Sequence, residues 1–188
     1  MQRTLTLIGL ALLLTTAGQA AAQGKSAKAK KIANAMSAGP RSISADAMIM
    51  DWPAAEGAPM TMLRNGTNGW TCLPDMPATK GNDPMCVDDQ WMTAMGAMMK
   101  KETPKIAHTG IGYMIAPGGT WGSNTDPYAT KATANNEWGN DPPHIMLLEP
   151  SAAALEGIPA TRQRGIPWVM WKGTPYAHIM VPLALAKK

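Results

Sequence analysis

The sequence predicts an α+β fold, a single domain in which an antiparallel sheet of five to seven strands packs on one main helix. Several short segments alternate between two faces, as strands do, and Gly, Pro and Asn-Gly turns separate them. One segment, residues 84–101, instead has the helical spacing of apolar side chains. No repeat of about 20–50 residues and no second change of composition follows residue 40, so residues 41–186 are expected to form one domain.

The N-terminus predicts a secretory signal peptide, residues 1–22. Arg3 precedes an apolar run at residues 5–14, and the alanines at residues 20–22 fit the small-residue cleavage pattern. The run is too short to cross a bilayer core, and no later segment is long and apolar enough, so no transmembrane segment is expected. We therefore expect a periplasmic or secreted protein, and a role as a cell-envelope component stays open.

Residues 23–40 predict a flexible basic leader, because they hold four lysines and no acid. Between residues 41 and 186, ten Lys and Arg stand against thirteen Asp and Glu, so the domain itself carries a charge of −3. The basic balance of the whole chain therefore comes from its ends. Nucleic-acid binding is not expected, because it needs a basic patch on a folded face.

The first predicted strand covers residues 47–52, which alternate between two faces and stop at Pro53. A hairpin is expected next, with residues 60–64 as one arm and residues 70–73 as the other. Its connection, residues 65–69, holds two Asn-Gly pairs, which supply the positive φ angles that tight turns need.

Cys72 and Cys86 are the two cysteines of the chain. In an oxidising compartment the simplest expectation is one disulfide between them. The loop that this disulfide closes has 15 residues, for which the chain-entropy model gives a stabilisation of about 3 kcal/mol. A metal pair or a reactive thiol is the alternative, although neither cysteine has a histidine nearby in the sequence.

The main helix is predicted over about residues 84–101. Asp83 is placed to cap it, Pro84 occupies its first position, and Pro104 stops it. Its apolar face consists of Trp91, Met92, Met95, Met98 and Met99. The chain is methionine-rich, with 16 Met and no Phe, so methionine is expected to fill much of the core.

Four later strands are expected, at residues 106–115, 143–150, 168–173 and 176–184. Residues 117–143 form a long connection, of a length that is often functional. It holds Trp121 and Trp138, whose rings are candidates for ligand binding by stacking on a sugar or a peptide. The plainer interpretation is that both rings anchor the connection to the domain.

The tripeptide His-Ile-Met occurs twice near the C-terminus. Alternation places His144 and Met146 on one face of a strand, and it does the same for His178 and Met180. On neighbouring strands in matching register, these two imidazoles and two thioethers would converge as a metal site that suits Cu(I). His108 would then be a third nitrogen ligand. The alternative is a pair of core strands with structural histidines, so copper is a suggested cofactor rather than an assigned one.

Five blocks of sequence resemble small exported bacterial proteins that have no assigned function. These blocks are GTNGWTCLPD, GNDPMC, SNTDPYAT, PPHIM and WVMWKGTPYAHIMVP. They lie within residues 60–182, and the last block is the most specific. The resemblance implies a secreted single domain, and it brings no catalytic residues to this chain.

We therefore expect an exported protein that is a non-enzymatic binding or structural module. An envelope copper-binding protein with paired His-x-Met strands is the alternative. A small hydrolase is the third interpretation, in which folding would assemble His178, Asp126 and Ser123. The chain has no G-x-S-x-G, no H-E-x-x-H and no phosphate-binding loop, so no catalytic residue is assigned.

Overall fold

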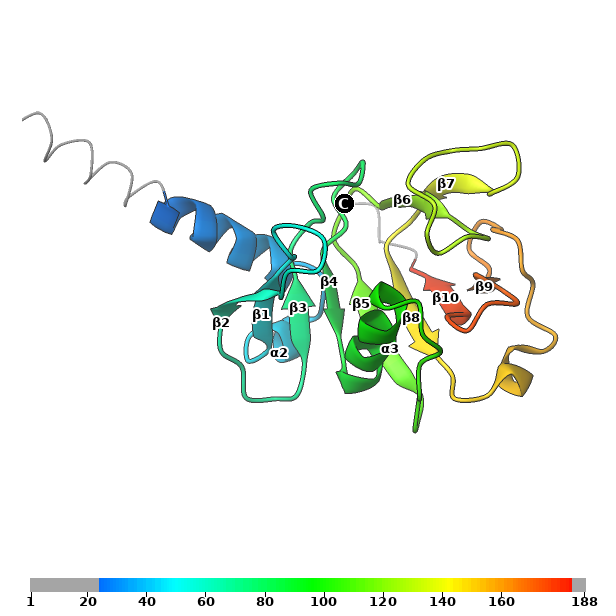
Figure 1. The fold of residues 1–188 in the computed structure, drawn as a ribbon, viewed down its shortest axis with the longest axis horizontal. Coiled ribbons are helices and arrows are strands. Elements are labelled where there is room, and N and C mark those ends of the chain that lie inside the picture. The colour runs from blue at the N-terminus through cyan, green and yellow to red at the C-terminus, as the bar shows by residue number, and fades with distance from the viewer. Residues whose placement is uncertain (1–23, 184–188) are drawn as a thin grey trace, which may run out of the picture.

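The computed structural model of the protein describes residues 24–183. Its centre is an eight-stranded sheet in the order β2-β1-β3-β4-β5-β8-β10-β9, and a separate pair, β6 and β7, lies above the β8–β10 end in Figure 1. The strands are β1 (Met48–Asp51), β2 (Thr61–Arg64), β3 (Thr71–Leu73), β4 (Met85–Val87), β5 (Gly110–Met114), β6 (Thr120–Ser123), β7 (Trp138–Asp141), β8 (His144–Leu148), β9 (Trp168–Met170) and β10 (His178–Pro182). The predicted α+β class is confirmed, and the sheet is larger than predicted.

The N-terminal end of the sheet differs from the predicted hairpin. β1 lies between β2 and β3, antiparallel to the first and parallel to the second. The predicted hairpin is therefore wrong, although both of its arms are strands. β2 and β3 run antiparallel to each other but are not neighbours, because their connection crosses the start of β1, where the Thr67 N–H donates to the Asp46 carbonyl. A Cβ at Gly66 would lie only 2.0 Å from the Met48 nitrogen, so glycine is required at this crossing.

The main helix, α3 (Asp89–Met99), begins later than predicted. Asp88 caps it by accepting a hydrogen bond from the Trp91 N–H. Residues 85–87 are instead β4, which pairs with β3 on one side and with β5 on the other. Sheet pairing on both sides thus overrides the local helix-start signal at Asp83.

The C-terminal end of α3 is a Schellman turn. The Lys101 N–H donates to the Met98 carbonyl, and the Glu102 N–H donates to the Ala97 carbonyl. Lys101 has a φ of 59°, in the left-handed region that glycine usually occupies. A residue with a side chain costs roughly 1 kcal/mol there.

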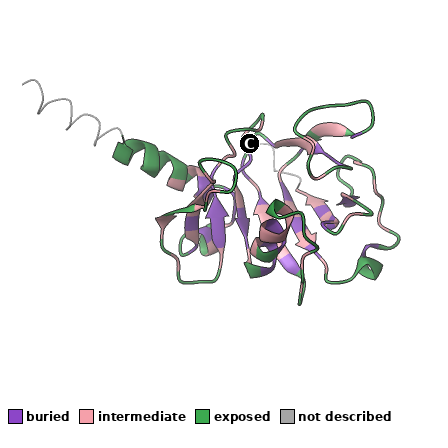
Figure 2. Cartoon of the chain, in the orientation of Figure 1, coloured by how far each residue is buried: buried purple, intermediate pink, exposed green. Residues whose placement is uncertain are grey.

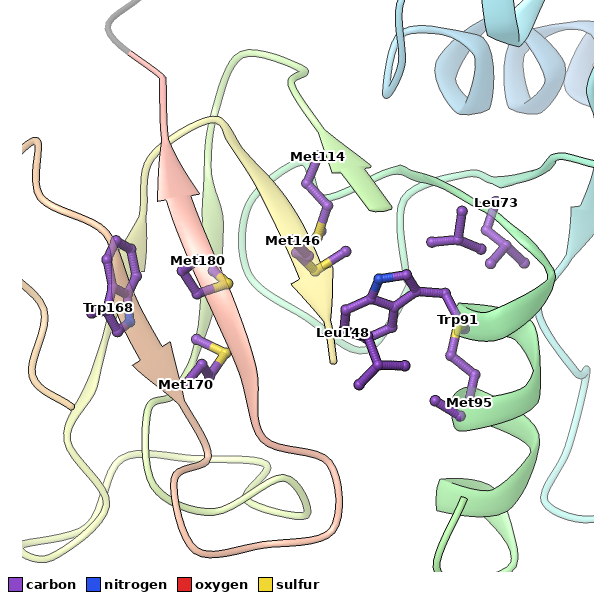
Figure 3. Packing of buried hydrophobic residues seen from close by; sticks show 11 residues of the cluster. Leu73, Trp91, Met95, Met114, Met146, Leu148, Trp168, Met170 and Met180 are labelled. Atoms are coloured by element: carbon purple, nitrogen blue, oxygen red, sulfur yellow. The ribbon is translucent and has the colours of Figure 1, made fainter. Parts of the chain in front are cut away.

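α3 packs across β5, where two glycines allow a close approach. A Cβ at Gly110 would lie 2.9 Å from the Gln90 Cβ, and one at Gly112 would lie 3.4 Å from the Trp91 Nε1. The buried cluster on this face, shown in Figure 3, consists of Leu73, Val87, Trp91, Ala94, Met95, Met114, Met146, Leu148, Trp168, Met170 and Met180. Methionine therefore supplies much of the core, as the composition predicts.

The opposite face of the sheet is covered near β3 and β4 by a helix over residues 24–36. A short helix, α2 (Arg41–Ser44), follows it. The first turns of the longer helix are exposed (Figure 2). Ala35 in its last turn and Ala38 just after it are fully buried. The sequence predicts a flexible leader over residues 23–40; the structure differs, because these small residues pack against the sheet.

The predicted signal peptide, residues 1–22, lies outside the described residues. Within residues 24–183, no helix combines the length and the apolar character that crossing a membrane requires.

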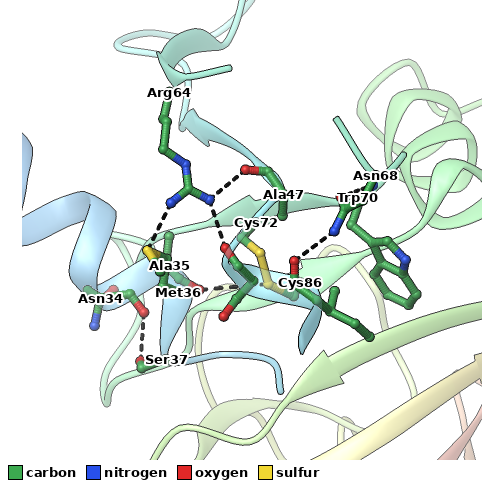
Figure 4. The surroundings of a disulfide bond; sticks show 12 residues. Asn34, Ala35, Met36, Ser37, Ala47, Arg64, Asn68, Trp70, Cys72 and Cys86 are labelled. Atoms are coloured by element: carbon green, nitrogen blue, oxygen red, sulfur yellow. Dashed lines mark hydrogen bonds between the residues drawn. A yellow bond between two sulfur atoms is a disulfide. The ribbon is translucent and has the colours of Figure 1, made fainter. Parts of the chain in front are cut away.

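Cys72 and Cys86 form the predicted disulfide (Figure 4). They are directly paired residues of β3 and β4, their Cα atoms lie 4.0 Å apart, and both are fully buried.

Arg64 lies nearby and donates to the carbonyl oxygens of Ser44 and Ala47. The same guanidinium thereby joins β2 to the segment between α2 and β1.

Between β5 and β8 the chain leaves the sheet and forms the β6–β7 hairpin. Arg162 holds this hairpin by an ion pair with Asp141 and by hydrogen bonds to the carbonyl oxygens of Gly122 and Glu137. Between the two strands the chain extends toward the end of α3 as residues 125–131, here named the strap.

Candidate functional site

A pocket of about 430 Å³ lies between α3, the sheet and the β6–β7 hairpin with its strap. β5, β8, β9 and β10 contribute its floor, and Ala94 and Met95 of α3 belong to one wall. Nine of the 16 methionines and four tryptophans line it. Because thioether side chains are flexible and polarizable, such a lining adapts to the shape of an apolar occupant.

Two histidines of the pocket lining are each only 1% exposed. The Nδ1 atom of His144 lies 2.6 Å from the Pro142 carbonyl oxygen, and that of His178 lies 2.9 Å from the Tyr176 carbonyl oxygen. A carbonyl only accepts, so each Nδ1 carries the proton and each Nε2 keeps its lone pair. Neither Nε2 has a hydrogen-bond partner in the described part of the chain.

Burial keeps both imidazoles neutral at neutral pH. It lowers the pKa of His144, and it lowers the pKa of His178 to about 4, where electrostatic repulsion by His144 adds a smaller contribution. The hydrogen bonds to the backbone carbonyls act in the opposite direction and are weaker. The pocket therefore offers two neutral imidazole lone pairs, which accept hydrogen bonds or ligate a metal ion.

Two tryptophans pack against His178. The Trp91 ring meets the imidazole edge to face with centroids 4.9 Å apart, and the Trp171 ring does so at 5.0 Å. Trp171 has a φ of 55°, a left-handed conformation that is costly for a bulky residue. Its backbone N–H donates to the Asn124 carbonyl and its indole N–H to the Ser123 carbonyl, which hold it in place. Such a maintained strained residue is typical of functional sites.

The Trp91 indole nitrogen is the third buried side-chain nitrogen without a partner among residues 24–183. It belongs to the same pocket as the two unpartnered histidine nitrogens. The largely apolar lining thus contains two unpaired hydrogen-bond acceptors and one unpaired donor.

The two His-x-Met strands are neighbours in the sheet, and all four of these side chains line the pocket. The strands are antiparallel, however, with Met146 opposite Met180 and His144 opposite Pro182. The histidines therefore lie at opposite ends of the methionine pair, about 14 Å apart along the strand direction. The four side chains do not meet in the matching register that a single four-ligand site requires.

Two methionines that the sequence did not single out lie beside the histidines. Met114 of β5 is the direct cross-strand partner of His144, and Met170 of β9 is that of His178. Both are buried and line the pocket. The sequence shows on which face of its own strand each methionine lies. It does not show which strand is the neighbour, because that depends on how distant segments pair.

The strap closes one side of the pocket. Tyr128 donates a hydrogen bond of 2.8 Å to the Tyr176 hydroxyl, which in turn donates one of 2.8 Å to the Glu102 carbonyl beyond the end of α3. The bond from Tyr128 raises the pKa of Tyr176 to about 12. Lys101 lies 5.8 Å from the centroid of the Tyr128 ring. The strap is thus joined to α3 through two tyrosines.

Two acids of the pocket lining are buried, Asp83 and Asp141, and Arg162 pairs with the second. Asp83 accepts a hydrogen bond from the Met76 N–H, and its own N–H donates to the Asp75 carboxylate. Burial raises the pKa of Asp83, and the neighbouring Asp75 adds to this. Within the described residues, no group of three or more His, Cys, Asp or Glu is placed to hold a metal ion.

The two tryptophans proposed for stacking have different positions. Trp121 lines the pocket, and Lys80 lies 4.8 Å from the centroid of its ring. Trp138 is half-buried and is not part of the pocket lining.

The three residues of the hydrolase interpretation share the pocket without forming a catalytic chain. Ser123 donates its hydroxyl hydrogen to the Asn136 carbonyl, so it is not hydrogen-bonded to His178. Asp126 is exposed. His108, suggested as a further metal ligand, is exposed and does not line the pocket.

No protein-family model matches the chain, and no curated protein or solved structure matches it either. The geometry of the pocket therefore carries the functional argument.

Proposed function

We propose that this chain is an exported, non-enzymatic binding protein and that the methionine-lined pocket is its binding site. Export rests on the signal-like residues 1–22. The observation that carries the binding proposal is the set of three buried nitrogens without partners in one pocket. An unsatisfied buried polar group costs about 1–3 kcal/mol, so three of them are best explained by a ligand that pairs with them.

The pocket supports a small, largely apolar ligand that carries an O–H or N–H group. Its volume, about 430 Å³, lies within the range of about 300–1,000 Å³ that small-molecule sites occupy. The histidine Nε2 atoms accept hydrogen bonds, and the Trp91 N–H donates one. A hydroxyl group both donates and accepts, so it matches this set.

The proposal is tested with two probes of nearly equal shape, 1-naphthol and 1-methylnaphthalene, by titration calorimetry on the oxidised protein. Only 1-naphthol donates a hydrogen bond to an imidazole. A hydrogen bond contributes about 0.5–1.5 kcal/mol net, so we expect 1-naphthol to bind about 3- to 10-fold more tightly.

Two variants of α3 locate the probe. Ala94 is 4% exposed and lines the pocket, whereas Thr93 is exposed on the other side of the same helix. Ala94→Phe fills the pocket and is expected to abolish 1-naphthol binding; Thr93→Phe is the matched control and should leave it unchanged. Absence of binding by both probes, or binding that survives Ala94→Phe in a folded protein, would overturn the proposal.

A further inference from the structure

β8 and β10 are arranged around a local two-fold axis that passes between Met146 and Met180. These residues are direct cross-strand partners. On each strand, a histidine lies two residues before this central methionine. Each histidine is also directly opposite a second methionine on the outer neighbouring strand, Met114 for His144 and Met170 for His178. Each imidazole thus has its own pair of thioethers on the same face of the sheet.

We propose that these residues form two separate Cu(I) half-sites, each with one imidazole nitrogen and two thioether sulfurs. The first half-site consists of His144, Met114 and Met146, and the second consists of His178, Met170 and Met180. The inference rests on the proposed function in one respect, because it takes the same pocket as the binding site. It goes further by naming a metal ion and a stoichiometry.

The ligand chemistry favours a soft, monovalent ion. Thioether sulfur is a soft ligand that selects Cu(I), and neutral imidazole suits copper as well. Both imidazoles are fixed through Nδ1 on a backbone carbonyl and present a free Nε2. This is the orientation that metal-ligating histidines adopt, with the second ring nitrogen anchored by a hydrogen bond.

The spacing within each half-site permits convergence on one ion. Direct cross-strand partners have Cβ atoms about 4.5–5.5 Å apart, and residues two apart on a strand are separated by about 7 Å. In Figure 3 the thioether of Met114 points toward that of Met146, and the thioether of Met170 points toward that of Met180. Metal–ligand bonds of about 2.0–2.3 Å to nitrogen and sulfur fit between side chains placed in this way.

A single copper site that uses both histidines is not compatible with the antiparallel register of β8 and β10. Two imidazoles on one ion have nitrogens separated by no more than about 4 Å, twice a metal–nitrogen bond. The Cα atoms of His144 and His178 lie about 14 Å apart along the strands. Side chains of a strand stand roughly perpendicular to the sheet, so the two imidazoles do not close this gap. The antiparallel register therefore separates the repeat into two sites.

The charge of the first bound ion weakens the binding of the second. The six ligand side chains are neutral, so each bound ion adds one positive charge. Asp83 and Asp141 line the same pocket, although Arg162 already pairs with Asp141. The half-sites lie on the order of 10 Å apart, and repulsion at that distance in a protein interior weakens the second ion by about tenfold.

The test is a Cu(I) titration of the oxidised protein in competition with a chromophoric chelator. Ascorbate is the reductant, because the buried disulfide must stay closed to keep thiolates out of the measurement. We expect two equivalents to bind, the second about tenfold more weakly than the first. X-ray absorption of the protein with one equivalent should show one nitrogen and two sulfurs around copper.

Methionine-to-leucine pairs identify the ligands, since this exchange nearly conserves volume and preserves folding. Met114→Leu/Met146→Leu should leave one equivalent, and Met170→Leu/Met180→Leu should also leave one. Combining all four should leave none. Met95→Leu/Met98→Leu is the matched control, because these methionines line the pocket from α3 without a paired histidine, and it should retain both equivalents.

Each outcome is decisive. Loss of all copper on changing either pair would show one shared site and overturn the two half-sites. Absence of Cu(I) binding, with 1-naphthol still bound, would overturn the metal proposal and leave the proposed function standing. Absence of both kinds of binding would overturn both.

Discussion

The two halves of the sheet contrast in what they bury. The disulfide half, β2-β1-β3-β4 with the helix over residues 24–36, buries small and aliphatic side chains around Cys72–Cys86. The pocket half, β5-β8-β10-β9 with α3, buries methionine, tryptophan and two histidines. Among residues 24–183, all three buried side-chain nitrogens without partners lie in the pocket half.

Within one continuous sheet, the disulfide half contributes mainly to stability and the pocket half provides the proposed binding site. The disulfide half is cross-linked and its buried interior is aliphatic. The pocket half instead keeps unpaired nitrogens and a strained Trp171, both of which lower stability. Its methionines add flexible side chains. The comparison predicts that changes in the disulfide half alter unfolding without altering the pocket.

Removing the disulfide tests this separation with the largest effect. Cys72→Ala/Cys86→Ala should lower the free energy of unfolding by about 3 kcal/mol, because the 15-residue loop is no longer closed in the unfolded chain. Urea denaturation measures this loss, and the reduced native sequence should show a similar one. Probe binding by the folded fraction should be unchanged. Unaltered stability, or a lost pocket, would contradict the division into two halves.

Asp88 lies between β4 of the disulfide half and α3 of the pocket half, and its removal should have an intermediate effect. Its carboxylate accepts hydrogen bonds from the N–H groups of Trp91 at the start of α3 and Ile111 in β5. Asp88→Ala should cost about 2 kcal/mol, roughly 1 for the helix cap and 1 for the unpaired strand N–H. The neighbouring Asp89 is exposed and does not cap the helix, so Asp89→Ala should change stability by less than about 0.5 kcal/mol. Equal losses in thermal unfolding would contradict this assignment.

Lys101 allows a small change of the opposite sign. Lys101→Gly should raise the free energy of unfolding by about 0.5–1 kcal/mol, because its φ of 59° favours glycine. Lys100 has ordinary right-handed angles, so Lys100→Gly should bring no gain. Chemical denaturation of both variants decides the matter, and a loss at Lys101 would show that its contact with Tyr128 outweighs the backbone strain.

The sequence predicted features that depend on local periodicity. Alternation located β1, β8 and β10, the spacing of Trp91 and Met95 located α3, and the cysteine pair located the disulfide. Each of these signals lies within a few residues or follows from the predicted export. These signals were enough to predict the α+β class and to single out His144 and His178, which carry two of the three unpaired buried nitrogens.

Features that depend on pairing between distant segments were not predictable in this way. The insertion of β1 between β2 and β3 follows from how the chain crosses at Gly66. The late start of α3 follows from sheet pairing on both sides of β4. Met114 and Met170 became candidate ligands only when the strand order placed them opposite His144 and His178.

The packing of two indoles against His178 has a spectroscopic consequence. Tryptophan emission responds to the polarity and the quenchers around each ring, and Trp91 and Trp171 both touch this imidazole. An event at His178 therefore changes the light that these rings emit. Trp70 packs against Tyr113 on the opposite face of the sheet, away from the pocket, so its emission does not depend on His178. The molecule carries an intrinsic optical reporter on each face of its sheet.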